Sequence, residues 1–252
     1  GIHMKVYEGA ILTCDANDQV ARYLVEDGGR ILYVGDELPE RYISVRHERL
    51  GKKALIPAFT DSHIHFASFS TFHAGLNVMN AASNEEILSM LSDFAKKSDQ
   101  KMLIGFGASP YSVKERRLVN RNELDRVCPD KPVFMGKYDG HACVVAISDY
   151  VTNSISVPQL LKNMQKAIDY MASKGIGMIH TVSGVGFVRD LDVDLERWFG
   201  RGLNNGMQMR VFFQTMDVKK VQKRHLPRVG GCFATALDGC FGSKDAALRV
   251  PY

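Results

Sequence analysis

The chain has 252 residues, of which 45% are hydrophobic and 24% are charged, and this composition is ordinary for a folded protein with a sizeable core. Its formal net charge is +4 at pH 7, and no Lys or Arg run is dense enough to indicate a nucleic-acid interface. No apolar stretch approaches the ~20 residues that a membrane-spanning helix needs. The five cysteines are scattered without a Cys-x-x-Cys pair, so we expect a cytoplasmic protein without a disulfide framework.

The first four residues, GIHM, resemble a cloning remnant that ends in a native start at Met4, so His3 carries no functional argument. Residues 5–54 contain short apolar or alternating runs separated by turns, and the Asp27-Gly28-Gly29 turn is a strong hairpin signal. Short runs of this kind, joined by tight turns, are typical of paired β-strands. We therefore predict that this part of the chain belongs to a small β-sandwich.

Two histidines follow the apolar run of residues 54–59, which we expect to be a buried strand. His63 and His65 are two positions apart, and residues two apart on a strand share a face. Imidazole is the commonest metal ligand, so this pair can hold one metal ion. The alternative for an isolated His-x-His is a structural or surface role.

Beyond His65 the hydrophobic pattern changes to helices that alternate with short apolar strands. The predicted helices cover residues 83–94, 122–127, 156–174, 194–202 and 217–225. The predicted strands cover residues 102–106, 133–135, 176–182, 209–213 and 232–237. This alternation favours βα units around a parallel sheet and predicts a protein of the α/β class.

The segment of residues 55–66 (LIPAFTDSHIHF) resembles the strand and His-x-His signature of the amidohydrolase superfamily of metal-dependent hydrolases, with Ala58 where most members have Gly. Three further segments resemble one branch of it, which includes the N-substituted formamide deformylases and uncharacterised relatives. They are residues 121–133, 138–142 and 237–252. The resemblance implies a (β/α)8 TIM-like barrel, of which only the first half or so is represented here, with a small flanking β-sandwich domain.

The same resemblance divides the chain after residue 54. Residues 5–54 would be the N-terminal part of a composite β-sandwich domain, and residues 55–252 would be a partial metal-dependent hydrolase barrel. Members of the branch are longer, which implies that the C-terminal half of the barrel is missing. They also have a stretch between the segment that resembles residues 138–142 and the long helix, which implies a missing segment between Val145 and Ala146. A naturally short relative is the alternative, but a half barrel would expose open strand edges and apolar helix faces.

The resemblance also implies a metal centre. His63 and His65 would bind a divalent metal ion, for which zinc is favoured. Ala234 stands where some members carry a lysine whose carbamate bridges two metals. One ion is therefore favoured over two.

The substrate pocket is expected to include His141, His180 and Asp238, of which the two histidines could instead hold a turn or a strand in place. The catalytic general base is unknown, because the late-strand aspartate that performs this role in relatives is absent from the sequence. We therefore expect this chain alone to be inactive.

The implied function is a metal-dependent amidohydrolase that hydrolyses an amide, formamide or cyclic amide C–N bond. A bound zinc-like ion lowers the pKa of its water from 15.7 to about 7, which makes that water a nucleophile at neutral pH. The alternatives are a non-catalytic or regulatory small-molecule-binding relative, or a deaminase on the same scaffold. We expect the protein to bind a small-molecule substrate and to bind neither nucleic acid nor a membrane. A homo-oligomer is possible.

Overall fold

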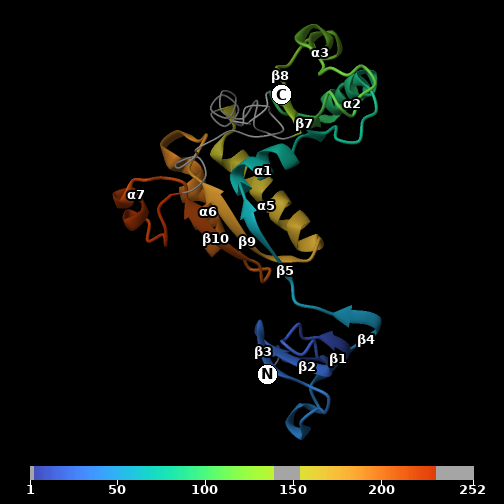
Figure 1. The fold of residues 1–252 in the computed structure, drawn as a ribbon, viewed down its shortest axis with the longest axis vertical. Helices are drawn as coiled ribbons and strands as arrows, with labels where there is room; N and C mark the ends of the chain where they lie inside the picture. The colour runs from blue at the N-terminus through green and yellow to red at the C-terminus, as the bar shows by residue number, and fades with distance from the viewer. Residues whose placement is uncertain (1–2, 139–153, 231–252) are drawn as a thin grey trace, which may run out of the picture. The chain divides into compact units, whose positions relative to one another are not determined.

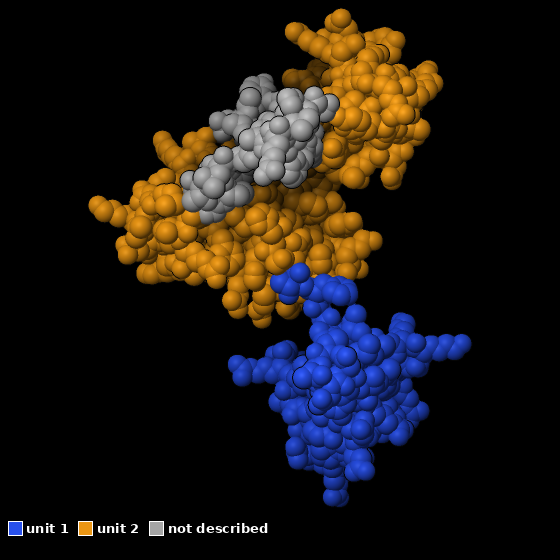
Figure 2. All heavy atoms as spheres, viewed as in Figure 1, with its two compact units in different colours: residues 1–60 blue, residues 61–252 orange. Residues whose placement is uncertain are grey.

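A computed structural model describes residues 3–138 and 154–230 of the chain. The chain divides into two compact units, Gly1–Thr60 and Asp61–Tyr252 (Figure 2). The described residues form a mixed α/β protein, as predicted. The predicted strand at residues 232–237 and the predicted missing segment after Val145 lie outside the described residues.

Unit 1 contains a four-stranded sheet in the order β3-β2-β1-β4. Its strands are β1 (Lys5–Leu12), β2 (Val20–Asp27), β3 (Arg30–Gly35) and β4 (Arg46–Leu55). The β2–β3 connection is the predicted hairpin turn, in which Gly28 (φ 56°) and Gly29 (φ 83°) both adopt positive φ. Two consecutive residues with positive φ are characteristic of the type I′ turn, which suits glycine because it has no Cβ.

The apolar run of residues 54–59 is not one buried strand, contrary to the prediction. Strand β4 ends at Leu55, and the next strand, β5 (Phe59–Ile64), begins only after Pro57. Proline has no N–H to donate to a ladder, so it separates the two strands. Ile56 is 47% exposed and Phe59 is 59% exposed, so this stretch does not supply the core that its composition indicates.

Unit 2 contains a first sheet of three strands in the order β10-β9-β5. Strands β9 (Ile176–Ser183) and β10 (Gln208–Phe213) are parallel, with His180 opposite Arg210. The neighbour of β5 is thus β9, which lies more than a hundred residues further along the chain. Figure 1 shows these strands side by side in the middle of the unit.

The segment between β5 and β9 forms a second three-stranded sheet in the order β6-β7-β8. Its strands are β6 (Leu76–Asn77), β7 (Leu103–Ala108) and β8 (Val133–Lys137), all parallel. Helices α2 (Asn84–Lys97) and α3 (Arg121–Val127) connect them. The predicted helices and strands of this segment are therefore present, but they do not join the sheet that contains β5.

The main core of unit 2 lies between helices and the first sheet. The helices are α1 (Phe66–His73), α5 (Val157–Ser173) and α6 (Leu191–Arg201). Helix α7 (Val218–Lys223) places Val221 in a smaller cluster with Val193 and Phe213. Helix α1 packs on α5, while α5 contacts β9 and α6 contacts β10 (Figure 1). Phe66, Met164, Ile168 and Ile179 are fully buried there, which confirms the apolar face predicted for α5. In the described part of the chain, no helix has the length and apolar character needed to cross a membrane.

Candidate functional site

His63 and His65 lie together at the C-terminal end of β5. His63 belongs to the strand, and its backbone N–H donates to Asp61 Oδ1 at 3.2 Å. His65 is the residue that precedes helix α1. Their rings meet edge to face, with centroids 5.4 Å apart and an interplanar angle of 86°. The structure thus brings together the two residues that were predicted to bind a metal.

The side chain of His65 is held in one tautomer by the backbone of β9. Its Nδ1 lies 2.7 Å from the carbonyl oxygen of Val182. A carbonyl can only accept a hydrogen bond, so Nδ1 carries the proton and Nε2 keeps its lone pair. Gln214 Nε2 lies 3.4 Å from the same Nδ1, and the shorter carbonyl contact decides the tautomer. This arrangement leaves Nε2 as the atom that can bind a metal ion.

The site lies where three neighbouring strands end. His65 follows β5, Val182 is near the end of β9, and Gln214 follows β10. The backbone N–H of Gln214 donates to the Ser183 carbonyl at 2.7 Å, which joins the ends of β9 and β10. Sites at the carboxyl ends of parallel strands are typical of α/β proteins. Gln214 was not predicted, although a polar residue directly after the apolar strand Gln208–Phe213 was a usable signal.

A cavity of about 370 Å³ opens beside His63. It is lined by Ser62, His63, His180, Val182, Phe212, Phe213, Arg228, Val229 and Gly230. His180 therefore shares a cavity with His63. The predicted pocket residues His141 and Asp238, and Ala234 with them, lie outside the described residues.

His180 reaches the cavity because side chains alternate along β9. Ile179, Thr181 and Ser183 are buried, whereas His180 and Val182 are only partly buried and face the cavity. The Nε2 atom of His180 is buried and has no hydrogen-bond partner within the described chain. Its ring centroid lies 5.4 Å from that of Phe212.

Two buried carboxyl groups lie on the opposite face of β9. Glu196 of α6 is 0% exposed and accepts hydrogen bonds from Ala67 N, Thr181 Oγ1 and Ser183 Oγ. Burial raises the pKa of Glu196 to about 8, and the nearby charge of Asp192 adds to this effect. Burial also raises the pKa of Asp192 to about 6, although the N–H of Gly184 donates to its Oδ2 at 2.7 Å and opposes the shift. Neither acid was predicted. Asp192 lies before the helix predicted at residues 194–202, and Glu196 lies within that helix among other charged residues.

The described residues supply an incomplete set of metal ligands. Among residues 3–138 and 154–230, no group of three or more His, Cys, Asp or Glu side chains is placed to hold a metal ion. The two imidazoles His63 and His65 have the ligand chemistry that zinc prefers, and their ring centroids lie 5.4 Å apart. Two imidazoles are fewer than the three or four protein ligands that a zinc site has.

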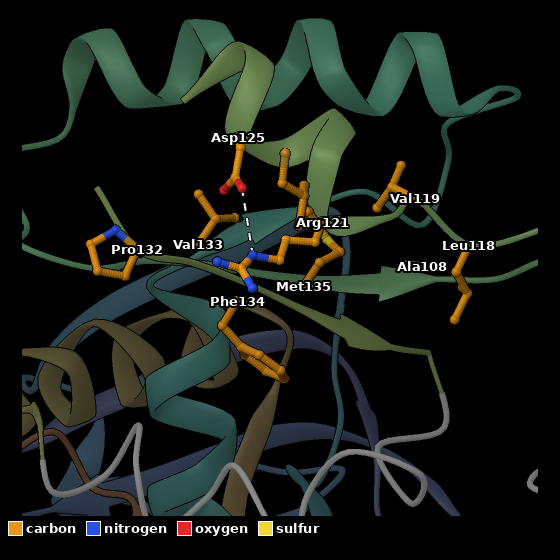
Figure 3. Close-up of a pocket in the computed structure, with 10 residues that line it drawn as sticks. Ala108, Leu118, Val119, Arg121, Asp125, Pro132, Val133, Phe134 and Met135 are labelled. Carbon is orange, nitrogen blue, oxygen red and sulfur yellow. Dashed lines mark ion pairs between the residues drawn. The ribbon is translucent and has the colours of Figure 1, made fainter. Parts of the chain in front are cut away.

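A second cavity, of about 460 Å³, lies between α3 and the β6-β7-β8 sheet (Figure 3). Val133, Phe134 and Met135 of β8 form part of its wall. Two of its ten lining residues form an ion pair, with Arg121 Nε 3.6 Å from Asp125 Oδ2. None of the predicted site residues lines this cavity.

Comparison with known proteins gives one family and several distant relatives. Residues 50–250 match the model of the amidohydrolase family. The chain is 25% identical over 145 residues to the N-substituted formamide deformylase of Arthrobacter pascens, a match that covers 55% of this chain and 27% of that protein. It is 29% identical over 146 residues to the exoenzymes regulatory protein AepA of Pectobacterium carotovorum subsp. carotovorum, covering 54% of this chain and 31% of that protein.

The fold resembles that of a solved structure, an uncharacterised metal-dependent hydrolase from Pyrococcus furiosus. The TM-score is 0.63 at 21% identity, and the match covers 96% of this chain and 58% of the other. The chain thus matches only part of each of these proteins, and less than a third of the two curated relatives.

Proposed function

The chain belongs to the amidohydrolase family, and from this premise we propose that it contributes a metal centre to a hydrolase that cleaves a C–N bond. The prediction made from residues 55–66 is thereby confirmed at the level of the family. The observation that carries the proposal is the pair His63 and His65, whose ring centroids lie 5.4 Å apart, with His65 Nδ1 held by the Val182 carbonyl at 2.7 Å.

For the fold we propose a (β/α)8 TIM-like barrel in which β5, β9 and β10 are neighbouring strands, and a β-sandwich that includes unit 1. The parallel pairing of β9 with β10 and the placement of the site at the strand ends support the barrel. The resemblance to the metal-dependent hydrolase from Pyrococcus furiosus also supports it. In this arrangement the segment that carries β6, β7 and β8 is an insertion after the first barrel strand.

For the cofactor we propose one divalent ion, with zinc favoured, held by His63 and His65 and by further ligands from outside the described residues. A bound ion of this kind supplies an activated water and a polarised carbonyl at neutral pH. His65 presents Nε2, and the Val182 carbonyl keeps its ring from rotating. His180 and Phe212 form a wall of the adjacent cavity, where we place the substrate together with His141 and Asp238.

The proposed substrate is an amide, formamide or related C–N compound, and the similarity to a formamide deformylase supports this choice. We retain as proposals a small-molecule partner and a cytoplasmic location. A second candidate function is that of a regulatory or small-molecule-binding relative. It is favoured by the 29% identity to the exoenzymes regulatory protein AepA.

The metal centre can be tested by equilibrium dialysis of the chain against Zn²⁺, followed by elemental analysis. We expect bound zinc in the wild-type chain and its loss in the His63→Ala, His65→Ala double variant. His47→Ala is the matched control, because His47 is an exposed histidine of unit 1. Equal zinc content in the double variant and the control would reject the assignment.

A further inference from the structure

We propose that Glu196 is a positioning residue that holds His65 against the Val182 carbonyl and so presents Nε2 of His65 to the metal. The inference rests on the proposed metal site, but the geometry of Glu196 is independent of any ion. Its carboxyl group contacts both of the segments that the His65–Val182 hydrogen bond joins.

On the β9 side, Glu196 binds the two residues that flank Val182. Thr181 Oγ1 donates to Glu196 Oε1 at 3.1 Å, and Ser183 Oγ donates to Oε2. Both hydroxyls lie on the buried face of the strand. Because the residues before and after Val182 are held, the direction of the Val182 carbonyl is held as well.

On the α1 side, Glu196 binds the turn that follows His65. The backbone N–H of Ala67 donates to Glu196 Oε1 at 3.0 Å, and the N–H of Phe66 donates to Thr181 Oγ1 at 3.1 Å. The first N–H groups of a helix have no partner within the helix, and His65, the residue in the N-cap position, makes no side-chain cap. Glu196 and Thr181 therefore replace the missing cap from another part of the chain.

The burial of Glu196 argues against a role in packing alone. The side chain is 0% exposed, and burying a carboxyl group is costly unless its atoms are paired. A leucine would fill similar space without that cost, but it would leave the Ala67 N–H without an acceptor. The side-chain oxygens of Glu196 instead pair with the α1 backbone and with both hydroxyls of β9.

The test compares Glu196→Leu, which removes all three hydrogen bonds, with Glu196→Gln, which keeps an acceptor oxygen. Val193→Ala is the matched control, because Val193 lies on the same helix but packs against Val211 and Phe213. All measurements are made where circular dichroism shows that each variant is folded. If Glu196→Leu does not fold, the same measurements are made on Thr181→Val. That substitution removes the hydrogen bond from Phe66 N with little change in side-chain shape.

Two measurements separate positioning from stability. The first is the affinity for Zn²⁺, measured by competition with a chromophoric chelator, for which we expect a loss of at least about tenfold in Glu196→Leu. Glu196→Gln and Val193→Ala are expected to bind Zn²⁺ within about threefold of the wild-type affinity. This change is smaller than the loss of affinity that usually follows removal of a residue that orients a metal ligand. The second is the ¹⁵N spectrum of the His65 ring in metal-free protein, which should change from a single Nδ1–H tautomer to a mixture in Glu196→Leu and in Thr181→Val.

A single Nδ1–H tautomer in folded Glu196→Leu would overturn the proposal, as would an equal loss of affinity in Val193→Ala. If the wild-type chain binds no zinc, the proposed metal centre fails. The tautomer measurement then still decides whether Glu196 positions His65.

Discussion

His65 Nδ1 lies 2.7 Å from the carbonyl oxygen of Val182, although 117 residues separate the two in sequence. The contact joins the end of β5 to the end of β9 and selects the tautomer of His65. A metal site built on this histidine therefore depends on a strand pairing that is remote in the chain.

Binding of zinc should stabilise unit 2. Zn²⁺ at a concentration a hundred times its dissociation constant should raise the free energy of unfolding by about 2.7 kcal/mol, because it binds the folded state alone. Urea titrations monitored by the fluorescence of Trp198, the single tryptophan of the chain, measure this directly. The increase should vanish with a chelator and in the His63→Ala, His65→Ala variant, and its persistence in that variant would contradict the proposed ligands.

Replacing His180 by leucine should stabilise the metal-free protein by about 1 kcal/mol, because a buried polar atom without a partner is lost. Urea denaturation of the variant measures the change. Phe212→Leu, which removes the neighbouring ring and no polar atom, should instead destabilise by about 1 kcal/mol. A His180→Leu variant that is less stable than wild type would indicate that His180 is a structural residue rather than a pocket residue.

The stability of unit 2 should fall as the pH rises from 4.5 to 8. The pKa of Glu196 is raised from an ordinary 4.5 to about 8, so the folded state binds the proton more tightly than the unfolded state. The stabilisation is complete below pH 4.5 and is lost as the pH approaches 8, with a total on the order of 4 kcal/mol. Asp192, with a pKa raised from 3.8 to about 6, adds a loss in the lower part of this range.

Glu196→Gln is the variant that checks this pH dependence, because the amide resembles the protonated acid and does not titrate. Its unfolding free energy should match that of the wild type near pH 5 and exceed it at pH 8. Parallel curves for the two proteins, followed by Trp198 fluorescence in urea, would show that Glu196 does not cause the slope.

Gly184, the residue after β9, should not tolerate a side chain. Its φ is +109°, and a Cβ there would lie 2.6 Å from the ring of Phe213. Gly184→Ala should therefore destabilise unit 2 by about 2 to 3 kcal/mol, through backbone strain and overpacking together. Gly206→Ala is the control, because Gly206 has φ +84° but open space around it, and it should lose only about 1 kcal/mol. Equal losses in urea denaturation would show that the Phe213 contact is unimportant.

Local sequence patterns predicted most of the helices and strands in the described part of the chain. The apolar spacing of Leu160, Met164 and Ile168 indicated the buried face of α5, and Gly28 with Gly29 indicated the hairpin between β2 and β3. These features depend on residues close in sequence, where the periods of helix and strand are directly visible. The apolar run around Pro57 was predicted wrongly. Proline has no N–H for a strand ladder, so the chain forms two strands there although its neighbours are apolar.

The sequence by itself was enough to identify His63 and His65 as a candidate pair of metal ligands, because their residue type and their spacing are both visible in two nearby positions. Only the tertiary structure decided what surrounds that pair: the pairing of β5 with β9, the Val182 carbonyl on His65, and the Glu196 carboxyl group beneath both. A backbone carbonyl has no residue type to reveal it, and a buried acid on an amphipathic helix looks like any surface acid. Such contacts join residues more than a hundred positions apart, and they exist only once hydrophobic burial has brought their helices and strands together.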